Sequence, residues 1–404
     1  MLCGLGCDKA ADEVYLGVDL LPVSAVKLSR RHVLDSQSLA NTDSVRCVRR
    51  HGDRGYSAVL YCARKKLRAA GVLAGAAFLV VGTHASSYAA SDYNAAEMLE
   101  GQSRMIGPVE SLQVRPDVYM LTVEGINVTL QTGPDGSVVV DPGPASASNA
   151  LIEAIRTLTP EPIRLVIDTS GDPELIGGNA SLAEAGRALM TTPLGLQAPI
   201  IARQNVLNGL IAQPGEQYSA AALPTEVFAR PQYGFYLNEQ GIEVIAEPAA
   251  HSDGDSAVRF PRSDVVVTGE LFDDTRFPVI DIKHGGSVQG EIDALNELIN
   301  REVNTPTPIV TNEQGTVVIP VRGPVCRQAD LVNYRDMIFS VRLRVQDLID
   351  RGMSLKQIQS QDPTLGYDSR WGSTSGSWTT ADFVQAVYLD LQTQKGRKRQ
   401  GTGG

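Results

Sequence analysis

The sequence predicts an α/β protein in which β-sheets are covered on their outer faces by helices. Short apolar runs rich in β-branched residues recur along the middle of the chain, each bounded by Gly, Pro, Asp or Asn, as is typical of strands. Some of these runs follow one another directly, as in hairpins, whereas others are separated by segments with helical periodicity. The 404 residues are 43% hydrophobic and 20% charged, which excludes a disordered chain, a collagen, a coiled coil and a polytopic membrane protein.

Four strands are expected between residues 117 and 168. Each is recognised by its β-branched residues and flanking turns, such as the Pro-Asp-Gly turn at 134–136. The stretch 147–158 is expected to be helical because Leu151, Ile155 and Leu158 recur on one face. The four strands are DVYMLTV (117–123), INVTLQ (126–131), SVVVD (137–141) and IRLVID (163–168).

Four later runs repeat the strand pattern, and a helix is expected at 288–301 between the last two of them. These runs are GIEVIAE (241–247), SAVRF (256–260), DVVVT (264–268) and TVVIP (316–320).

After these strands, the sequence pattern becomes helical. Apolar residues recur at helical spacing from 331 to 351, Ser354 and Gln357 form a capping box, and Thr379 with Asp382 starts a last helix. A helical extension at 331–394 and a disordered basic tail at 395–404 are therefore predicted.

The N-terminal 106 residues predict processing and export rather than fold. A basic stretch at 64–68, the apolar run 69–82 and small residues around Ala89 and Ala90 have the order of a signal peptide, placed at 61–90. The apolar run is too short to span a bilayer, which takes about 20 residues, although an uncleaved anchor stays an alternative. Residues 1–60 are interpreted as a disordered, over-extended start, and 91–106 as a linker. The expected location is periplasmic or secreted.

Charge and metal-binding residue types restrict the function further. The formal net charge of −10 argues against nucleic acid as a partner. The five cysteines have no repeated spacing, which argues against a disulfide framework or a zinc ribbon. Histidine is scarce, and three of the five precede the expected cleavage site.

The most specific segment is DTSGDPELIGGN at 168–179, directly after the strand 163–168. With its surroundings it resembles the metallo-β-lactamase superfamily, in which a strand leads into T-H-x-H-x-D-H-x-G-G-N. SVVVDPG, the stretch 249–272 and VVIPVRGPVC (317–326) resemble three further landmarks of that family in the same order. This resemblance, to secreted bacterial members, implies a four-layer αβ/βα sandwich over 107–330 that carries the C-terminal helical extension.

The resemblance also implies where metal would bind, and most of those positions are altered. The first zinc ion would be placed at Ser170, Asp172 and His251, so one imidazole is left of three. The second would use Glu174, Leu175 and Arg322, with Glu270 as the bridging residue. Leu175 cannot ligate a metal, and the Arg322 guanidinium is a fixed cation without a lone pair.

The leading hypothesis is therefore a metal-depleted pseudoenzyme without cofactor, which binds a small molecule or a partner protein in the former active-site cleft. In it, Arg322 replaces part of the lost positive charge among Asp172, Glu174 and Glu270. The alternative is a metal-dependent hydrolase of esters, thioesters or β-lactams, in which Asp172, Glu174, His251 and Glu270 hold a single Zn, Mn, Mg or Ca ion. Two other interpretations stay open: a metal-free triad based on Ser170, and a purely structural His251 bonded near Asp253 or Asp255.

Overall fold

The computed structural model describes residues 45–48, 59–62, 103–190, 196–212, 218–304 and 315–401, without the side chains of 45–48, 59–62, 302–304 and 395–401. Within the N-terminal unit 1–87, strands β1 (Val45–Val48) and β2 (Val59–Cys62) form an antiparallel pair. The expectation that residues 1–60 lack regular structure stays a prediction for the other residues of this segment. The rest of 1–60 and most of the predicted signal peptide lie outside the described residues.

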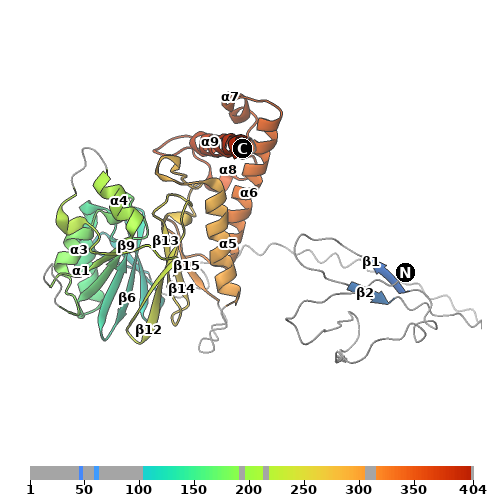
Figure 1. Ribbon diagram of the computed structural model, residues 1–404. Helices are drawn as coiled ribbons and strands as arrows, with labels where there is room; N and C mark the ends of the chain where they lie inside the picture. Colours follow the sequence, from blue (N-terminus) through green and yellow to red (C-terminus); the bar gives the residue numbers. More distant parts are fainter. Residues whose placement is uncertain are drawn as a thin grey trace, which may run out of the picture. The chain divides into compact units, whose positions relative to one another are not determined.

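Two β-sheets form the centre of the second unit, residues 88–404 (Figure 1). In the first sheet, of order β10-β9-β8-β7-β6-β5-β4-β3, neighbours from β3 to β7 are antiparallel and those from β7 to β10 are parallel. Its strands are β3 (Arg104–Ile106), β4 (Val109–Arg115), β5 (Val118–Val123), β6 (Ile126–Gly133), β7 (Gly136–Val140), β8 (Ile163–Ile167), β9 (Ile200–Arg203) and β10 (Glu226–Phe228).

The second sheet has the order β11-β12-β13-β14-β15 and is antiparallel except for the last, parallel pair. It consists of β11 (Gln232–Leu237), β12 (Gln240–Ala246), β13 (Ser256–Phe260), β14 (Val265–Val267) and β15 (Val317–Ile319). The eight predicted strands are all present, with ends that differ by at most two residues. Of the strands in these two sheets, β3, β4, β9, β10 and β11 were not predicted.

Helices cover the outer face of each sheet (Figure 1). The first sheet carries α1 (Ser148–Leu158), the short α2 (Pro173–Ile176), α3 (Asn179–Ala185) and α4 (Gln204–Ala212). The second carries α5 (Val288–Asn304) and α6 (Gln328–Asp350), and α7 (Leu355–Gln359), α8 (Asp368–Trp371) and α9 (Thr380–Gly401) complete the C-terminal extension. The predicted four-layer αβ/βα sandwich with its helical extension is thus confirmed.

Strand periodicity divides the core between the layers, because successive side chains point to opposite faces of a sheet. In β7, Val138 and Val140 join the cluster between the two sheets, whereas Val139 packs beneath α1. In β14, Val265 joins the cluster between the sheets and Val266 the cluster under α5 and α6. Both faces of these strands are buried, which explains their continuous apolar runs.

The C-terminal extension packs on the sandwich through aromatic side chains. Phe277 stacks on Phe383 of α9 with ring centroids 4.9 Å apart, and Tyr334 of α6 lies edge-on to Phe272 at 4.9 Å. The Ser354 capping box is confirmed. Helix α9 is described as far as Gly401, within the tail predicted from 395, and β3 lies at the end of the predicted linker 91–106. Within the described residues, no helix is long and apolar enough to cross a membrane.

Candidate functional site

The loop that follows β8 positions three of the predicted site residues. Asp172 is the N-cap of α2, and its Oδ1 accepts a hydrogen bond of 2.8 Å from the Glu174 backbone N–H. The Ser170 hydroxyl oxygen accepts from the Asp172 N–H at 3.1 Å. Leu175 is fully buried and packs with Ile176 in a small apolar cluster. These residues therefore shape the loop rather than presenting a set of metal ligands.

Gly178 and Asp141 hold the loop that follows β8 against the C-terminal end of β7. A Cβ on Gly178 would lie 2.5 Å from the Pro142 carbonyl oxygen, so only glycine allows this approach. Asp141 accepts hydrogen bonds of 2.8 Å from the backbone and the hydroxyl of Thr169. Burial raises the pKa of Asp141 to about 7, although both bonds oppose this shift. The predicted structural role of Asp141 fits these contacts.

Arg322, which lies just after β15, forms ion pairs with three carboxylates. Its Nη2 lies 2.5 Å from Glu174 Oε2, and its Nη1 lies 3.2 Å from Asp273 Oδ2 and 3.4 Å from Glu270 Oε1. Asp273, which the sequence analysis missed, takes the place expected for Asp172, because Asp172 caps α2. We call Arg322, Glu174, Glu270 and Asp273 the ion-pair cluster.

Glu270 and Asp273 of the ion-pair cluster are buried and Arg322 is mostly buried, and burial together with charge shifts the pKa values of Glu270 and Arg322. The side chains of Glu270 and Asp273 are each 3% exposed, whereas that of Glu174 is 61% exposed. Burial raises the pKa of Glu270, even though the positive charges of His251 and Arg322 lower it. For Arg322, burial lowers the pKa, but the charges of Glu270 and Asp273 outweigh this effect and raise it. Arg322 is therefore a permanent cation at this position.

His251 lies in the loop between β12 and β13, and its Nδ1 is 3.1 Å from Oδ1 of the fully buried Asp255. Burial alone would lower the pKa of His251, but the charge and hydrogen bond of Asp255, with Glu270 and Glu291 nearby, raise it to about 10. Within the described residues, no hydrogen bond joins His251 to Ser170, so the geometry gives a Ser170 triad no support.

A further buried carboxylate, Glu291 of α5, interacts electrostatically with His251 and was not anticipated. Its side chain is fully buried, and neither oxygen has a hydrogen-bond partner within the described part of the chain. Burial, followed by the charge of Asp255, raises the pKa of Glu291 well above its usual range. Glu291 was missed because its position in an amphipathic helix gives no sign that it faces His251.

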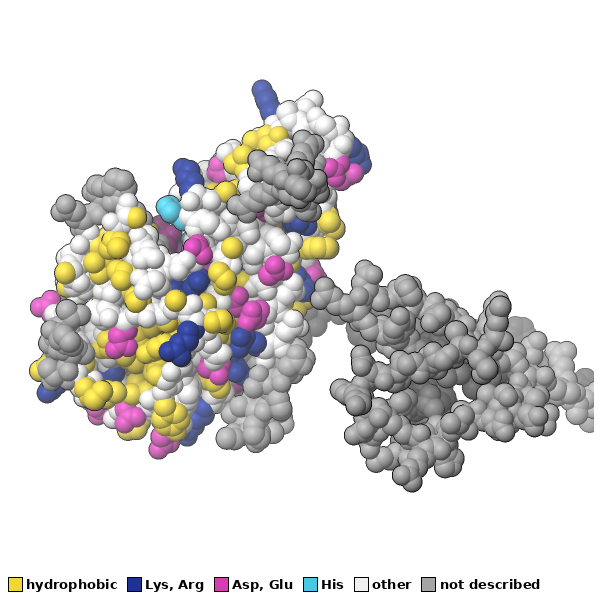
Figure 2. Space-filling view, in the orientation of Figure 1, with side chains coloured by type: hydrophobic (Ala, Val, Ile, Leu, Met, Phe, Trp, Pro, Cys, Tyr) yellow, Lys and Arg dark blue, Asp and Glu magenta, His cyan; other side chains and the backbone are white. Residues whose placement is uncertain are grey.

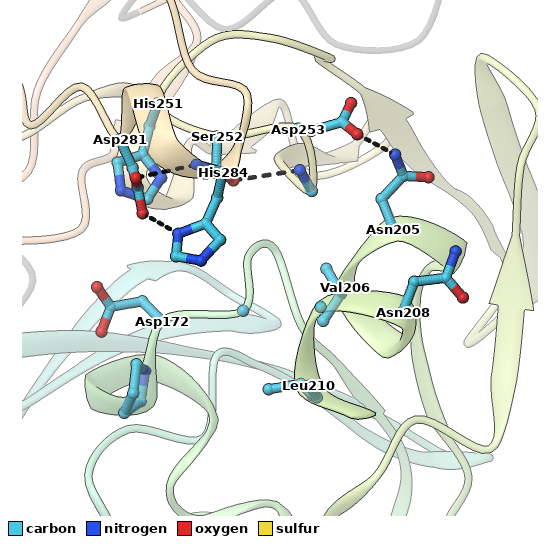
Figure 3. Close-up of a pocket in the computed structure, with 14 residues that line it drawn as sticks. Asp172, Asn205, Val206, Asn208, Leu210, His251, Ser252, Asp253, Asp281 and His284 are labelled. Atoms are coloured by element: carbon cyan, nitrogen blue, oxygen red, sulfur yellow. Dashed lines mark hydrogen bonds and ion pairs between the residues drawn. The ribbon is translucent and has the colours of Figure 1, made fainter. Parts of the chain in front are cut away.

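A cavity of about 440 Å³ is lined by Asp172 and Pro173, which directly precede Glu174 of the ion-pair cluster in the chain (Figure 3). Its walls come from the loop before α2, from α4, and from the loops around 251–254 and 281–284. In Figure 2, a histidine and acidic side chains border a hollow at the upper edge of the sandwich. Of the predicted site residues, only Asp172 and His251 line the cavity, whereas Ser170, Glu174, Leu175, Glu270 and Arg322 do not. The lining residues are Gly171, Asp172, Pro173, Asn205, Val206, Asn208, Gly209, Leu210, His251, Ser252, Asp253, Gly254, Asp281 and His284.

The donor set does not fit the zinc sites that the resemblance implies. Arg322 engages Glu174 and Glu270, Asp172 caps a helix, and the Nδ1 of His251 is bonded to Asp255. Among the residues that the structure describes, no three His, Cys, Asp or Glu side chains form a group that could hold a metal ion. The four ligands of the alternative interpretation, Asp172, Glu174, His251 and Glu270, are thus not assembled around one point.

Comparison with known proteins identifies the fold. The family model of the metallo-beta-lactamase superfamily matches residues 121–305. A metallo-beta-lactamase from Pontibacter korlensis is 16% identical at a TM-score of 0.45, over 57% of this chain and 98% of that one. The sec-alkylsulfatase Pisa1 from Pseudomonas sp. is 15% identical at a TM-score of 0.50, over 69% and 49%. A double mutant of the sec-alkyl sulfatase PisA1 is 14% identical at a TM-score of 0.54, over 70% and 50%.

The similarity to these solved structures concerns the fold alone. At such identities, the two alkylsulfatase structures show a shared fold and nothing about activity, and this chain matches about half of their length. No curated protein matches the chain.

Proposed function

The chain belongs to the metallo-β-lactamase superfamily, and from this premise we propose that it is a metal-independent member that binds a small molecule or a partner beside the degenerate metal site. The cavity lined by Asp172 and His251 supports a small molecule, because 440 Å³ lies in the range of small-ligand pockets. Hydrolysis by a zinc-bound water is no part of this proposal.

One observation carries the proposal, namely the three ion pairs of Arg322. A guanidinium has only donors, so it cannot ligate a cation, and its fixed charge repels one. It also engages two of the carboxylates, Glu174 and Glu270, that a metal would require. Charge-assisted hydrogen bonds from Arg322 thus take over the charge compensation that a metal ion would supply.

The test is the metal content of the full chain after gentle purification. We expect zinc well below one equivalent. An Arg322→His variant removes the fixed cation and adds an imidazole, so it is expected to take up more zinc than the unmodified protein. Arg351→His, which places a new histidine at the exposed C-cap of α6 beside Asp347, is the matched control and should not take up more zinc. Tightly bound stoichiometric zinc in the unmodified protein would overturn the proposal.

The second candidate function is a metal-dependent hydrolase. The excess of acidic groups favours it, since Glu174, Glu270 and Asp273 face a single Arg322 and attract cations. It requires hydrolysis of an ester, a thioester or a β-lactam that a chelator abolishes and that one divalent cation (Zn, Mn, Mg or Ca) restores. Hydrolysis that resists chelation would count against it.

We also propose that the protein is exported to the periplasm or secreted. The order of basic, apolar and small residues at 61–90 supports this proposal. Mass spectrometry of the native protein should find an N-terminus near Ala89 or Ala90. Peptides from the segment 1–54 would contradict both cleavage and the over-extended start.

A further inference from the structure

The second sheet ends in strand β11, whose outer edge has no partner strand among the described residues. The other edge strands of the sandwich, β3, β10 and β15, have three residues each, whereas β11 has six. Natural proteins protect an edge strand by short length, charged residues, proline or a bulge. The sequence QYGFYL of β11 contains no charged residue and no proline, and its register with β12 is regular over all six pairs. The strand therefore carries none of these devices against pairing with a further strand.

The hydrogen-bond pattern of the β11–β12 hairpin shows which backbone groups of β11 face outwards. The Pro231 carbonyl accepts a hydrogen bond of 2.8 Å from the Ala246 N–H, so position 231 faces β12. Successive residues direct their backbone groups to opposite sides of a strand, so those of Gln232, Gly234 and Tyr236 point away from β12. All three residues are exposed, Tyr236 at 72%. Their outward N–H and carbonyl groups have no backbone partner within the described part of the chain.

The core-facing side chains of β11 form an aromatic row that reaches this edge. Tyr233 stacks on Phe228 with ring centroids 5.6 Å apart, and the rings of Tyr233 and Phe235 lie 6.1 Å apart. Tyr233 and Phe235 are only half-buried against the cluster between the two sheets. A strand added to β11 would extend this cluster and bury more of the aromatic surface.

Two copies of β11 are self-complementary when they run antiparallel about a twofold axis at Gly234. In this register Gly234 lies opposite Gly234 of the second copy, and Gln232 lies opposite Tyr236 of the second copy. The outward backbone groups of all three residues then pair across the axis. Each core-facing Tyr233 meets Phe235 of the second copy, so the inter-sheet faces of the two sheets match.

The charges at the two ends of β11 favour a second copy over an unrelated extended peptide. Arg230 precedes the strand and Glu239 follows it in the turn to β12, and both are exposed. Antiparallel pairing brings Arg230 of each copy alongside Glu239 of the other, so opposite charges meet at both ends of the interface. Glu239 pairs with Arg262 at 3.0 Å, but its side chain is 73% exposed and thus accessible to a second partner.

From these observations we propose that the β11 edge is a homodimer interface, in which two copies pair antiparallel about Gly234. The second sheets of the two copies then join into one continuous sheet. This dimer goes beyond the proposed function, and it does not depend on whether the protein binds a metal ion.

Sedimentation equilibrium of the full chain over a concentration series measures the dissociation constant of the dimer. Gly234→Lys places two like charges opposite each other at the twofold axis and should raise this constant at least about tenfold. A lysine fits the single chain there, because a Cβ on Gly234 would meet the Ile242 carbonyl oxygen at an ordinary 3.7 Å. Gly241→Lys is the matched control and should leave the constant unchanged. Gly241 is an exposed glycine of the neighbouring strand β12, with open space for a Cβ.

Charge reversal tests the register independently of Gly234→Lys. Arg230→Glu should weaken the dimer, because it brings acidic groups together at both ends of the interface, and adding Glu239→Arg should restore it. Hydrogen–deuterium exchange gives a second measurement. The backbone N–H groups of segment 232–237 should exchange more slowly at concentrations at which the dimer forms, because the outward ones then have partners.

Several outcomes overturn the inference. A chain that stays monomeric throughout the series does so, even when it binds an unrelated extended peptide. A dimer that Gly241→Lys weakens as much as Gly234→Lys, or whose segment 232–237 exchanges as fast as in the monomer, uses another surface. Growth beyond two copies also contradicts it, because a twofold interface closes at the dimer.

Discussion

Removal of the Arg322 guanidinium tests the ion-pair cluster most directly. Arg322→Met keeps much of the side-chain length and takes away the charge. The side chains of Glu270 and Asp273 are each 3% exposed, so their pairs with Arg322 count as buried. Breaking a buried pair by removing one partner costs about 3–5 kcal/mol, because the other charge is left uncompensated.

The local contacts place this variant at the lower end of that range. Asp273 keeps a second partner, Arg276 Nε, at 2.8 Å, so the uncompensated group is mainly Glu270. We therefore expect the free energy of unfolding to fall by about 3 kcal/mol. Glu174→Gln is the matched comparison, because Glu174 is 61% exposed and its pair should contribute at most about 1 kcal/mol.

The loss should also depend on pH with a definite sign. The pKa of Glu270 is already raised in the folded protein, and without Arg322 it rises further. A carboxyl group whose folded pKa exceeds its unfolded pKa stabilises the fold at low pH, and this contribution is lost as pH rises through the folded pKa. The Arg322→Met variant should therefore be more strongly destabilised at a pH of about 8 than at about 5.

Urea unfolding of the full chain, followed by far-UV circular dichroism and by tryptophan fluorescence, measures both effects. Trp371 and Trp378, the two tryptophans of the chain, lie in the C-terminal extension. Coincident transitions by the two probes would show that the extension unfolds with the sandwich. A loss below about 1 kcal/mol, or one that grows as pH falls, would refute the buried ion-pair reasoning.

Three further predictions concern other buried groups. Burial, with the charge of Glu297, raises the pKa of Glu247 to about 8 in the folded protein. The protonated carboxyl group therefore stabilises the fold at a pH below the pKa of Glu247 in the unfolded chain, and this contribution is lost as the pH rises towards 8. Glu247→Gln should flatten the unfolding free energy over that window, and an unchanged profile would contradict the shift. Phe383→Ala should cost about 3–5 kcal/mol in urea unfolding, because it removes the stacking on Phe277. The side chain of His251 should titrate near pH 10 by NMR, and a midpoint at its ordinary value would show that Asp255 does not hold the proton there.

The sequence predicted most of the sandwich because its central strands are buried on both faces. Runs such as SVVVD and DVVVT need apolar side chains on both sides, so they stand out from the loops around them. The strands that were missed lie towards the edges of the sheets. In β11, exposed and half-buried side chains alternate, and the pattern EVF of β10 is too short to be distinctive.

For the candidate site, the sequence gives the residue types but not which of their side chains are neighbours. Ser170, Asp172 and Glu174 lie on the one loop that follows β8, as the order of the chain implies. Asp273 and Glu291 were missed because nothing in their local sequence shows that they face Arg322 or His251. The cavity has a wall from α4 that was not predicted, because the sequence pattern did not reveal this helix.

The sequence by itself determined that zinc ligands are absent from most of the family positions, because Leu175 and Arg322 lack a ligating atom in any conformation. Only the tertiary structure decided which carboxylates compensate Arg322, since that choice depends on how the segments after β14 and β15 pack against the loop after β8. Asp172 caps α2 and lines the cavity with Asp253 and His251. Asp273 instead pairs with Arg322 in the ion-pair cluster. Side-chain chemistry is fixed by residue type, whereas charge pairing between distant segments is fixed by packing.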